Sequence, residues 1–208
     1  MTLRSRLFSL FPAAFLLAAL ALAGWLLYRP GPLPAAALLI HLYLLPMACY
    51  RLHGALWPIR EGLSRLDLPD SYVPWWGGHM CQLPYDSFPQ LEAALRLLPG
   101  VYSLWLRGWG ARIGRGVYWT PLVEITDRAM LEIGDYAVIG HKAVLCAHLV
   151  SRKDSGALRL YLRRIRIGAG ALVGAGSRFG PGASAAPGEQ LPALTDRWAG
   201  GAPPERQP

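Results

Sequence analysis

Apolar positions in the second half of the chain recur every six residues. Between residue 113 and about residue 190, each block opens with a large apolar residue and often carries Ala or Val four places later. Gly, Asp or another polar residue lies between them. The blocks open at Ile113, Trp119, Ile125, Ile133, Ile139, Leu145, Ile167, Val173 and Phe179. Two extra residues, Leu131 and Glu132, interrupt the repeat, and residues 151–165 form a non-repeating insert. A fixed period is typical of a repeat architecture.

Six residues supply one short flat strand and one corner, so three blocks complete a triangular coil. Residues three blocks apart then stack, and the opening aliphatic residues form a column inside the prism. Each coil buries its apolar face only against its neighbours, and glycines permit tight backbone at the corners. The pattern therefore predicts a solenoid of parallel β-coils over residues 110–190, with an inserted loop at 151–165 and a C-terminal tail at 191–208.

The N-terminal part contains two long apolar runs, residues 7–28 and 33–50, separated by Arg-Pro-Gly-Pro at 29–32. The first has 22 residues, which is enough to cross a hydrocarbon core of about 30 Å. The second has 18 and is near the minimum for a span. We expect a transmembrane helical hairpin over residues 1–51. A cleaved signal peptide is the alternative, but the first run is long for one and lacks a clear cleavage site.

Arginine placement predicts the orientation of this hairpin. The arginines that flank the two runs are Arg4 and Arg6 before the first, Arg29 in the turn, and Arg51, Arg60 and Arg65 after the second. The positive-inside bias places both ends of the hairpin in the cytoplasm. We therefore expect a bacterial-type inner (cytoplasmic) membrane protein whose β-domain faces the cytoplasm.

Residues 52–109 connect the two parts and are rich in Trp and Tyr among Leu and Arg. These aromatic side chains favour the membrane–water interface. Leu91, Ala94, Leu95 and Leu98 share one face of a predicted helix. We expect short interfacial helices and a linker here, and packing of the same side chains against the first coil is the alternative.

The net charge of +8 comes almost entirely from arginine. No nucleic-acid-binding motif accompanies it, so an anionic lipid surface is the expected partner and nucleic acid is not. The insert holds a dense basic cluster that includes Arg152 and Arg164. These two residues are candidates for binding the phosphates of coenzyme A or an anionic lipid head group, and a solvated loop is the equally weighted alternative.

The six-residue repeat resembles that of the hexapeptide-repeat acyltransferases, whose fold is a left-handed parallel β-helix. The tail Arg-Trp-Ala-Gly-Gly-Ala-Pro at 197–203 is a blurred version of their Trp-x-Gly-x-Pro-Ala ending, and it makes Trp198 a substrate-binding candidate. A closer resemblance covers residues 110–149. It links Gly-Ala-Arg-Ile-Gly-Arg-Gly-Val at 110–117, Glu-Ile-Thr-Asp at 124–127, Ile-Gly-Asp at 133–135 and Ala-His-Leu at 147–149 to the membrane-embedded hexapeptide domains of ε-poly-lysine-synthase-like peptide synthetases and their stand-alone relatives.

This resemblance implies a homotrimer with a catalytic histidine at a corner of the coil, in a groove between two subunits. His148 occupies a corner position just before the insert, and acyl transfer needs a base for the acceptor's proton. A neutral imidazole with a pKa near physiological pH suits that role. The resemblance therefore carries the base role onto His148, although a lone histidine on a repeat is more often structural.

Three other side chains are candidates for supporting His148. Asp127 lies three blocks earlier, one coil below, and is expected to hold the imidazole or bind the acceptor, unless it only bonds its own corner. His141 is a candidate on the adjacent face, and Glu124 is a weaker substrate-binding candidate. The three cysteines, Cys49, Cys81 and Cys146, have no motif spacing, so no disulfide framework is expected. Cys146 is either a small core residue or a nucleophile.

Together these observations predict a membrane-associated acyltransferase. It would move an acyl group from a thioester donor, acyl-CoA or an acyl-carrier protein, to a hydroxyl or amine of a lipid, sugar or small molecule. No bound cofactor and no metal are expected. Because the last coils are short, a non-catalytic trimeric membrane scaffold is the main alternative. A γ-type carbonic anhydrase shares the fold but needs three histidines, and the repeat holds only His141 and His148.

Overall fold

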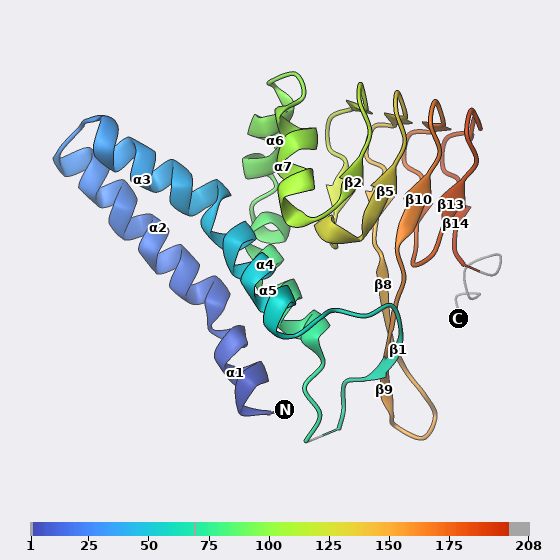
Figure 1. Cartoon of the computed structure of the whole chain (residues 1–208), viewed down its shortest axis with the longest axis horizontal. Coiled ribbons are helices and arrows are strands. Elements are labelled where there is room, and N and C mark those ends of the chain that lie inside the picture. Colours follow the sequence, from blue (N-terminus) through green and yellow to red (C-terminus); the bar gives the residue numbers. More distant parts are fainter. Residues whose placement is uncertain (1, 69, 200–208) are drawn as a thin grey trace. The chain divides into compact units, whose positions relative to one another are not determined.

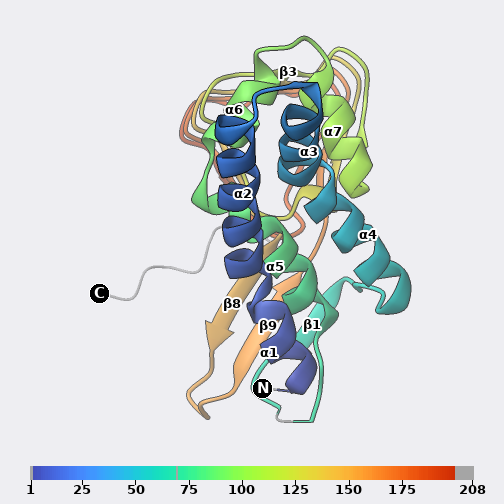
Figure 2. The same cartoon turned by 90° about the vertical axis from the view of Figure 1, so that its left-hand side faces the viewer.

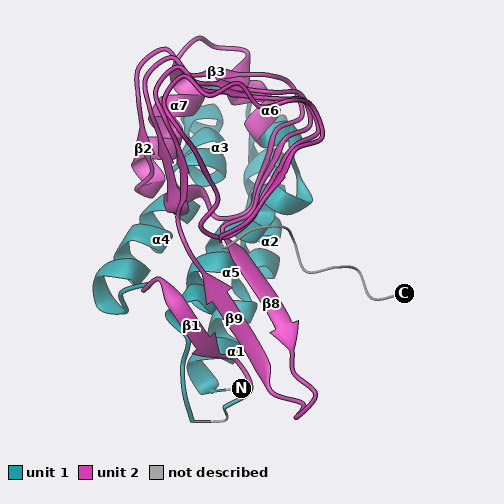
Figure 3. Cartoon of the chain, turned by 90° about the vertical axis from the view of Figure 1, so that its right-hand side faces the viewer, with its two compact units in different colours: residues 1–59, 68–91 teal, residues 60–67, 92–208 magenta. Residues whose placement is uncertain are grey.

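The computed structural model describes residues 2–68 and 70–199. The chain forms two compact units, one of residues 1–59 and 68–91 and the other of residues 60–67 and 92–208 (Figure 3). The predicted solenoid and membrane hairpin would make a membrane-anchored protein whose folded domain is all-β. Helices make up 42% of the structure, so the all-β class holds for the repeat region alone. The physical reason is that the apolar N-terminal runs and the aromatic-rich connection are both helical.

The first unit is built from helices α1 (Leu3–Ser9), α2 (Phe11–Tyr28), α3 (Pro32–Tyr43), α4 (Leu45–Leu56) and α5 (Pro74–Ser87). Helix α3 returns alongside α2 after a tight turn (Figure 2). The stretch Leu3–Tyr28 is long and apolar enough to cross a membrane, and α3 and α4 pass the same test only as a pair bent by 43°. The bend falls where Pro46 occupies the first turn of α4, because proline cannot donate to the preceding turn.

Several aromatic side chains of the connecting region are packed inside the protein. Trp75, Tyr85 and Trp105 are buried, and the interfacial placement of this region stays a prediction. His41 of α3 stacks on Phe15 of α2, and its Nε2 lies 2.9 Å from the Phe15 carbonyl oxygen. Such polar contacts fix the pairing of two otherwise uniformly apolar helices.

The second unit contains three parallel sheets that the chain visits in turn (Figure 1). The first sheet comprises β2 (Arg112–Ile113), β5 (Leu131–Ile133), β10 (Ile165–Ile167) and β13 (Ser184–Ala185). The second comprises β3 (Tyr118–Trp119), β6 (Val138–Ile139) and β11 (Leu172–Val173). The third comprises β4 (Glu124–Ile125), β7 (Val144–Leu145), β12 (Arg178–Phe179) and β14 (Asp196–Arg197). The opening residues Ile133, Ile139 and Leu145 are 3%, 0% and 0% exposed, which confirms a β-helix-like core.

Two helices lie before the coils. Helix α6 (Gln90–Arg96) spans the division between the units, and α7 (Val101–Trp109) packs against β2. Leu106 and Trp109 of α7 are fully buried. The first coil has no neighbour below it, so α7 covers apolar surface that a preceding coil would otherwise cover.

The two extra residues of the first coil are absorbed by a 3₁₀ turn, η1 (Arg128–Met130). Ile113 pairs with Ile133, 20 residues later, whereas Ile167 pairs with Ala185, 18 residues later. The stacking therefore resumes in register above the turn. This is why the irregularity in the repeat does not end the β-helix.

The insert is a β-hairpin rather than a loop. Strands β8 (His148–Arg152) and β9 (Leu158–Leu162) pair antiparallel, and β1 (Gly62–Arg65) pairs antiparallel with β9 to complete a three-stranded sheet. The expectation of an inserted loop was wrong because Leu158, Leu160 and Leu162 alternate with polar or aromatic residues, which is the two-residue period of a strand. Of the expected tail, residues 200–208 lie outside the described part of the chain.

Candidate active site

The structure brings Asp127 and His148 into direct contact. Nδ1 of His148 lies 2.7 Å from Oδ2 of Asp127. Asp127 is 2% exposed, while the side chain of His148 retains 16% of its exposure. A buried carboxylate thus meets an imidazole that solvent still reaches, which is the arrangement expected of a base and the group that orients it.

The stacking of two coils produces this contact. Strands β4 and β7 pair in parallel with Glu124 opposite Val144 and Ile125 opposite Leu145. Asp127 follows β4 and begins the η1 turn, and His148 follows β7 and begins the hairpin. Both side chains therefore leave the coil at the same corner, one coil apart, as the three-block spacing predicts.

The protonation of His148 differs from the sequence-based expectation. Burial alone lowers the pKa of this imidazole, but the hydrogen bonds to Asp127 and Cys146 and the charge of Asp127 raise it to about 10. The imidazolium is therefore favoured at neutral pH. The reason is that the carboxylate stabilises the charged ring more than burial destabilises it.

Cys146 completes a cluster around the same ring nitrogen. Its Sγ lies 3.8 Å from Nδ1 of His148, and the thiol donates to the His148 backbone carbonyl oxygen at 3.2 Å. Thr126 donates its hydroxyl to Oδ2 of Asp127 at 3.2 Å. Cys146 is half-buried, so its thiol lies at the edge of the site rather than in the core.

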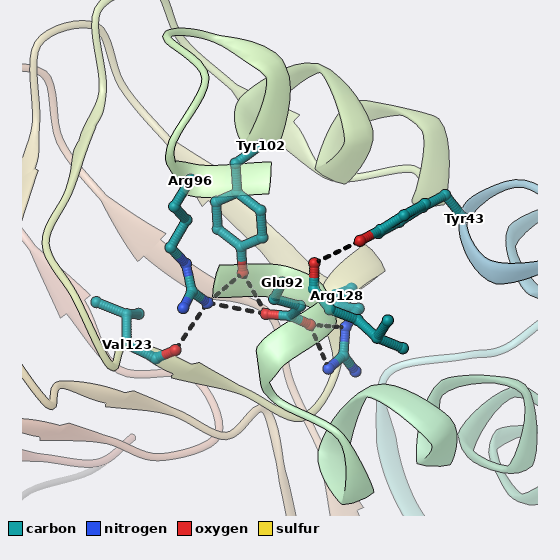
Figure 4. A network of polar contacts seen from close by, with 7 residues as sticks. Tyr43, Glu92, Arg96, Tyr102, Val123 and Arg128 are labelled. Atoms are coloured by element: carbon teal, nitrogen blue, oxygen red, sulfur yellow. Dashed lines mark hydrogen bonds and ion pairs between the residues drawn. The ribbon is translucent and has the colours of Figure 1, made fainter. Parts of the chain in front are cut away.

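A buried ionic network holds the turn that carries Asp127 (Figure 4). Nε of Arg128 donates to Oε1 of Glu92 at 2.5 Å, and Tyr102 and Arg96 donate to Oε2 of Glu92 at 2.6 and 2.9 Å. Arg96 also donates to the Val123 carbonyl oxygen at 2.8 Å. Glu92 is 3% and Arg128 1% exposed. Burial with the Glu92 charge raises the pKa of Tyr102 well above its ordinary value, so its phenol stays a donor.

The predicted substrate-binding residue Arg164 contacts the η1 turn, and its role toward a substrate stays a prediction. Its guanidinium donates to the carbonyl oxygens of Ala129 and Leu131 at 3.0 and 3.5 Å, and its Nε lies 3.6 Å from Oε1 of Glu61. These contacts tie the connection between β9 and β10 to the end of η1. With its donors engaged in this way, Arg164 is a support of the turn.

The remaining predicted site residues lie away from the Asp127–His148 pair. Arg152 is exposed at the hairpin tip, where it donates to the Gly156 carbonyl oxygen at 3.0 Å. Glu124 is exposed on the outer face of β4. His141 is exposed at a different corner, after β6. Trp198 packs over Gly180, where a β-carbon would lie only 2.0 Å from its ring.

The residues that the sequence did not reveal are Glu92, Arg96 and Arg128. Glu92 and Arg128 are 36 residues apart, on a helix and a turn that no periodicity connects. The local sequence gives only a weak sign of Arg128, which follows Asp127 and directly precedes the apolar Ala129 and Met130. A charge in such a run is buried only when it is paired.

Comparison with known proteins finds solved structures that are similar to this chain but does not assign it to a family. No family model and no curated protein matches this sequence. A hexapeptide-repeat-containing acetyltransferase from Vibrio cholerae, complexed with acetyl-coenzyme A, is 15% identical over 53% of this chain and 81% of its own, with a TM-score of 0.35. A maltose O-acetyltransferase from Clostridium difficile is 12% identical over 53% and 73%, with a TM-score of 0.31.

A third similar structure covers more of the chain. The serine acetyltransferase isoform 3 from Entamoeba histolytica, in complex with cysteine, is 13% identical over 82% of this chain and 75% of its own, with a TM-score of 0.22. Similarity at these levels does not assign an activity to this chain, and the relationship to ε-poly-lysine-synthase-like proteins stays a prediction. What the chain can do chemically therefore rests on the geometry of its own corner, where a buried carboxylate holds a partly exposed imidazole.

Proposed function

We propose that this protein is an acyltransferase that moves an acyl group from a thioester to a hydroxyl or amine. The observation that carries the proposal is the 2.7 Å contact between Nδ1 of His148 and the buried carboxylate of Asp127. In the neutral imidazole, the N–H group is at Nδ1 and donates to Asp127. The free lone pair is therefore on Nε2. That tautomer is the one a general base requires.

The proposed reaction is a direct transfer. Nε2 of His148 takes the proton from the acceptor's O–H or N–H group while the acceptor atom attacks the thioester carbonyl carbon. The tetrahedral intermediate collapses, the carbon–sulfur bond breaks, and the imidazolium returns its proton to the leaving thiolate. Asp127 stabilises the imidazolium in between, which is the role of a carboxylate paired with a catalytic histidine.

The donor and acceptor follow from the location we propose for the site. We propose acyl-CoA or an acyl-carrier thioester as donor, since both are cytoplasmic, and a lipid, a sugar or a small molecule as acceptor. The apolar stretch Leu3–Tyr28 would anchor the chain, with both ends of the helical hairpin in the cytoplasm. We also propose a homotrimer with left-handed coils, in which a neighbouring subunit would complete the substrate groove.

The test is transfer by the purified full-length chain in detergent. Release of free thiol from acyl-CoAs of increasing length is measured with alcohol and amine acceptors. Removing a general base typically costs 10²–10⁴-fold in rate, so we expect His148→Ala to lose about that much while staying folded at the assay temperature, although it should melt lower because it lacks the pair with Asp127. The same assay on His141→Ala compares the two histidines of the β-helix directly.

Three results would contradict the proposal. Equal rates for His148→Ala and the wild type would remove the base assignment. Loss of transfer in His141→Ala but not in His148→Ala would move the chemistry to another corner. A folded wild-type chain that turns over no acyl-CoA and no acyl-carrier thioester would favour the non-catalytic scaffold.

A further inference from the structure

Three different metal-ligand chemistries converge at the corner that holds His148. One ligand atom each of Asp127, Cys146 and His148 lies within 4.8 Å of the other two. No zinc-binding motif predicts this cluster, because the usual motifs combine several cysteines or histidines at fixed short spacings. Here the carboxylate comes from one coil, while the thiol and the imidazole come from the next.

The arrangement is not that of a catalytic cysteine relay. In such a relay the nucleophile faces one ring nitrogen and the carboxylate faces the other. In this protein both groups face Nδ1, with Oδ2 of Asp127 at 2.7 Å and Sγ of Cys146 at 3.8 Å. A thiol on the carboxylate's side of the ring cannot pass its proton to Nε2. Three potential metal-ligand atoms that lie close to one another are instead the arrangement expected of a metal site.

We infer that Asp127, Cys146 and His148 form a binding site for Zn²⁺, and that the ion switches off the base function of His148. Thiolate, imidazole and carboxylate together are a ligand set that zinc takes with three protein groups and one open position. Around a tetrahedral ion, ligand atoms lie roughly 3.3–3.7 Å apart. The Sγ–Nδ1 distance of 3.8 Å nearly meets that value, and the Nδ1–Oδ2 pair, at 2.7 Å, has to open by about 0.6 Å or more.

The surroundings suit an ion. The Thr126 hydroxyl holds Oδ2 of Asp127 at 3.2 Å, and the backbone N–H of Cys146 donates to the Phe179 carbonyl oxygen at 2.9 Å. Such outer contacts orient ligands and raise metal affinity. Asp127 is buried while Cys146 and His148 are half-buried, so the ion would enter from the solvent side of the corner.

Zinc binding and proton transfer exclude one another for a chemical reason. When the ion binds, the Cys146 thiol and Nδ1 of His148 each lose a proton to solvent, and Nδ1 gives its lone pair to the metal. The remaining proton of the neutral ring is then on Nε2, which can no longer accept one. The binding site stands without the proposed function, whereas the inhibition rests on it.

The binding test uses the full-length chain in detergent after treatment with a chelator. Zn²⁺ is measured by titration and by metal content after gel filtration, and Co²⁺ serves as a probe because a thiolate ligand gives it a charge-transfer band. We expect one ion per chain for the wild type and for the control Cys49→Ser, whose thiol lies in the first unit. Cys146→Ser should bind at least about 10-fold more weakly and lack the band. Equal binding by Cys146→Ser, or none by the wild type, would overturn the site.

The inhibition test compares each variant with its own zinc-free rate of thiol release. We expect Zn²⁺ to suppress transfer in the wild type at the concentrations that fill the site, and to have a much weaker effect on Cys146→Ser. If zinc fills the site and the rate is unchanged, the metal site stands and the base assignment of His148 fails. The two proposals can thus fail separately.

Discussion

At the scale of single residues, the pairing of His148 with Asp127 makes the chemistry pH-dependent. Because the pKa of His148 is raised to about 10, only a small fraction of the imidazole is neutral at pH 7. We predict that kcat/KM rises steadily from pH 7 toward pH 10 and then levels, since the neutral ring is the base. The pH–rate profile measures this, and a plateau reached by pH 7 would contradict it.

The same pair links stability to pH. The ordinary pKa of histidine is 6.5 and the folded value is about 10, so the stabilisation is complete below pH 6.5 and disappears as pH rises toward 10. We predict that Asp127→Asn lowers the free energy of unfolding more at pH 6 than at pH 10. Denaturant unfolding at both pH values tests this, and an equal loss at the two values would show that the charge of His148 is not involved.

The corners of the β-helix hold side chains in a strained backbone conformation. Positive φ angles recur every six residues, at glycines such as Gly170 (φ 67°) but also at Lys142 (φ 57°). A left-handed conformation costs a non-glycine residue roughly 1–2 kcal/mol. We predict that Lys142→Gly stabilises the protein by about 1 kcal/mol while Lys142→Ala does not.

The converse substitution gives the control for this strain. A β-carbon at Gly170 meets no atom within 4 Å, so Gly170→Ala should destabilise by about 1 kcal/mol through backbone strain alone. Thermal or denaturant unfolding measures both changes. If Lys142→Gly were less stable than Lys142→Ala, the side chain at that corner would have to contribute packing that its exposed position does not suggest.

At the scale of elements, the η1 turn decides where Asp127 lies, and the Glu92–Arg128 pair holds the turn. Removing one partner of a buried ion pair typically costs 3–5 kcal/mol because the other charge stays buried. We predict a loss of about that size for Glu92→Ala, which takes the shared carboxylate away from both Arg96 and Arg128. The matched control is Arg112→Ala, which breaks the exposed contact with Glu132 and should cost less than about 1 kcal/mol. Similar losses for both variants would contradict the assigned role.

The hairpin strands β8 and β9 are neighbours in the sequence, and only their third partner, β1, is far away. Residues 151–165 break the six-residue period, which is why they were expected to form a loop. In the structure β9 lies between β8 and β1, and Leu162 pairs with both His148 and Gly62. Pairing with a strand about 100 residues earlier depends on the folded arrangement and has no local signature.

At the scale of the whole molecule, we predict that the chain is an integral membrane protein. The stretch Leu3–Tyr28 and the bent pair α3–α4 pass the length and hydropathy test for spans. Expressed protein should sediment with membranes, resist alkaline and high-salt washing, and dissolve in detergent. In right-side-out vesicles, a tag at either terminus should be protected from protease.

A second set of outcomes separates the alternatives for this prediction. Release by high salt would indicate a surface protein held by its net charge of +8 rather than by spans. A mature chain that begins after about residue 28 would indicate a cleaved signal sequence. Either result would also remove the reason for proposing a membrane-bound acceptor.

The sequence alone determined the β-helix-like core, the stacking of Asp127 beneath His148 and the apolar N-terminal helices. These features are local or strictly periodic: six residues carry their own strand and corner, and apolar length is read directly. Only the tertiary structure decided that Glu92 reaches Arg128, that Cys146 shares Nδ1 of His148 with Asp127, and that β1 completes the hairpin sheet. The Glu92–Arg128 contact and the β1–β9 pairing join segments with no common period. The repeat places Cys146 near the corner of His148 but does not decide that its thiol faces Nδ1. Such geometry exists only once the chain has packed and each buried charge has found a partner.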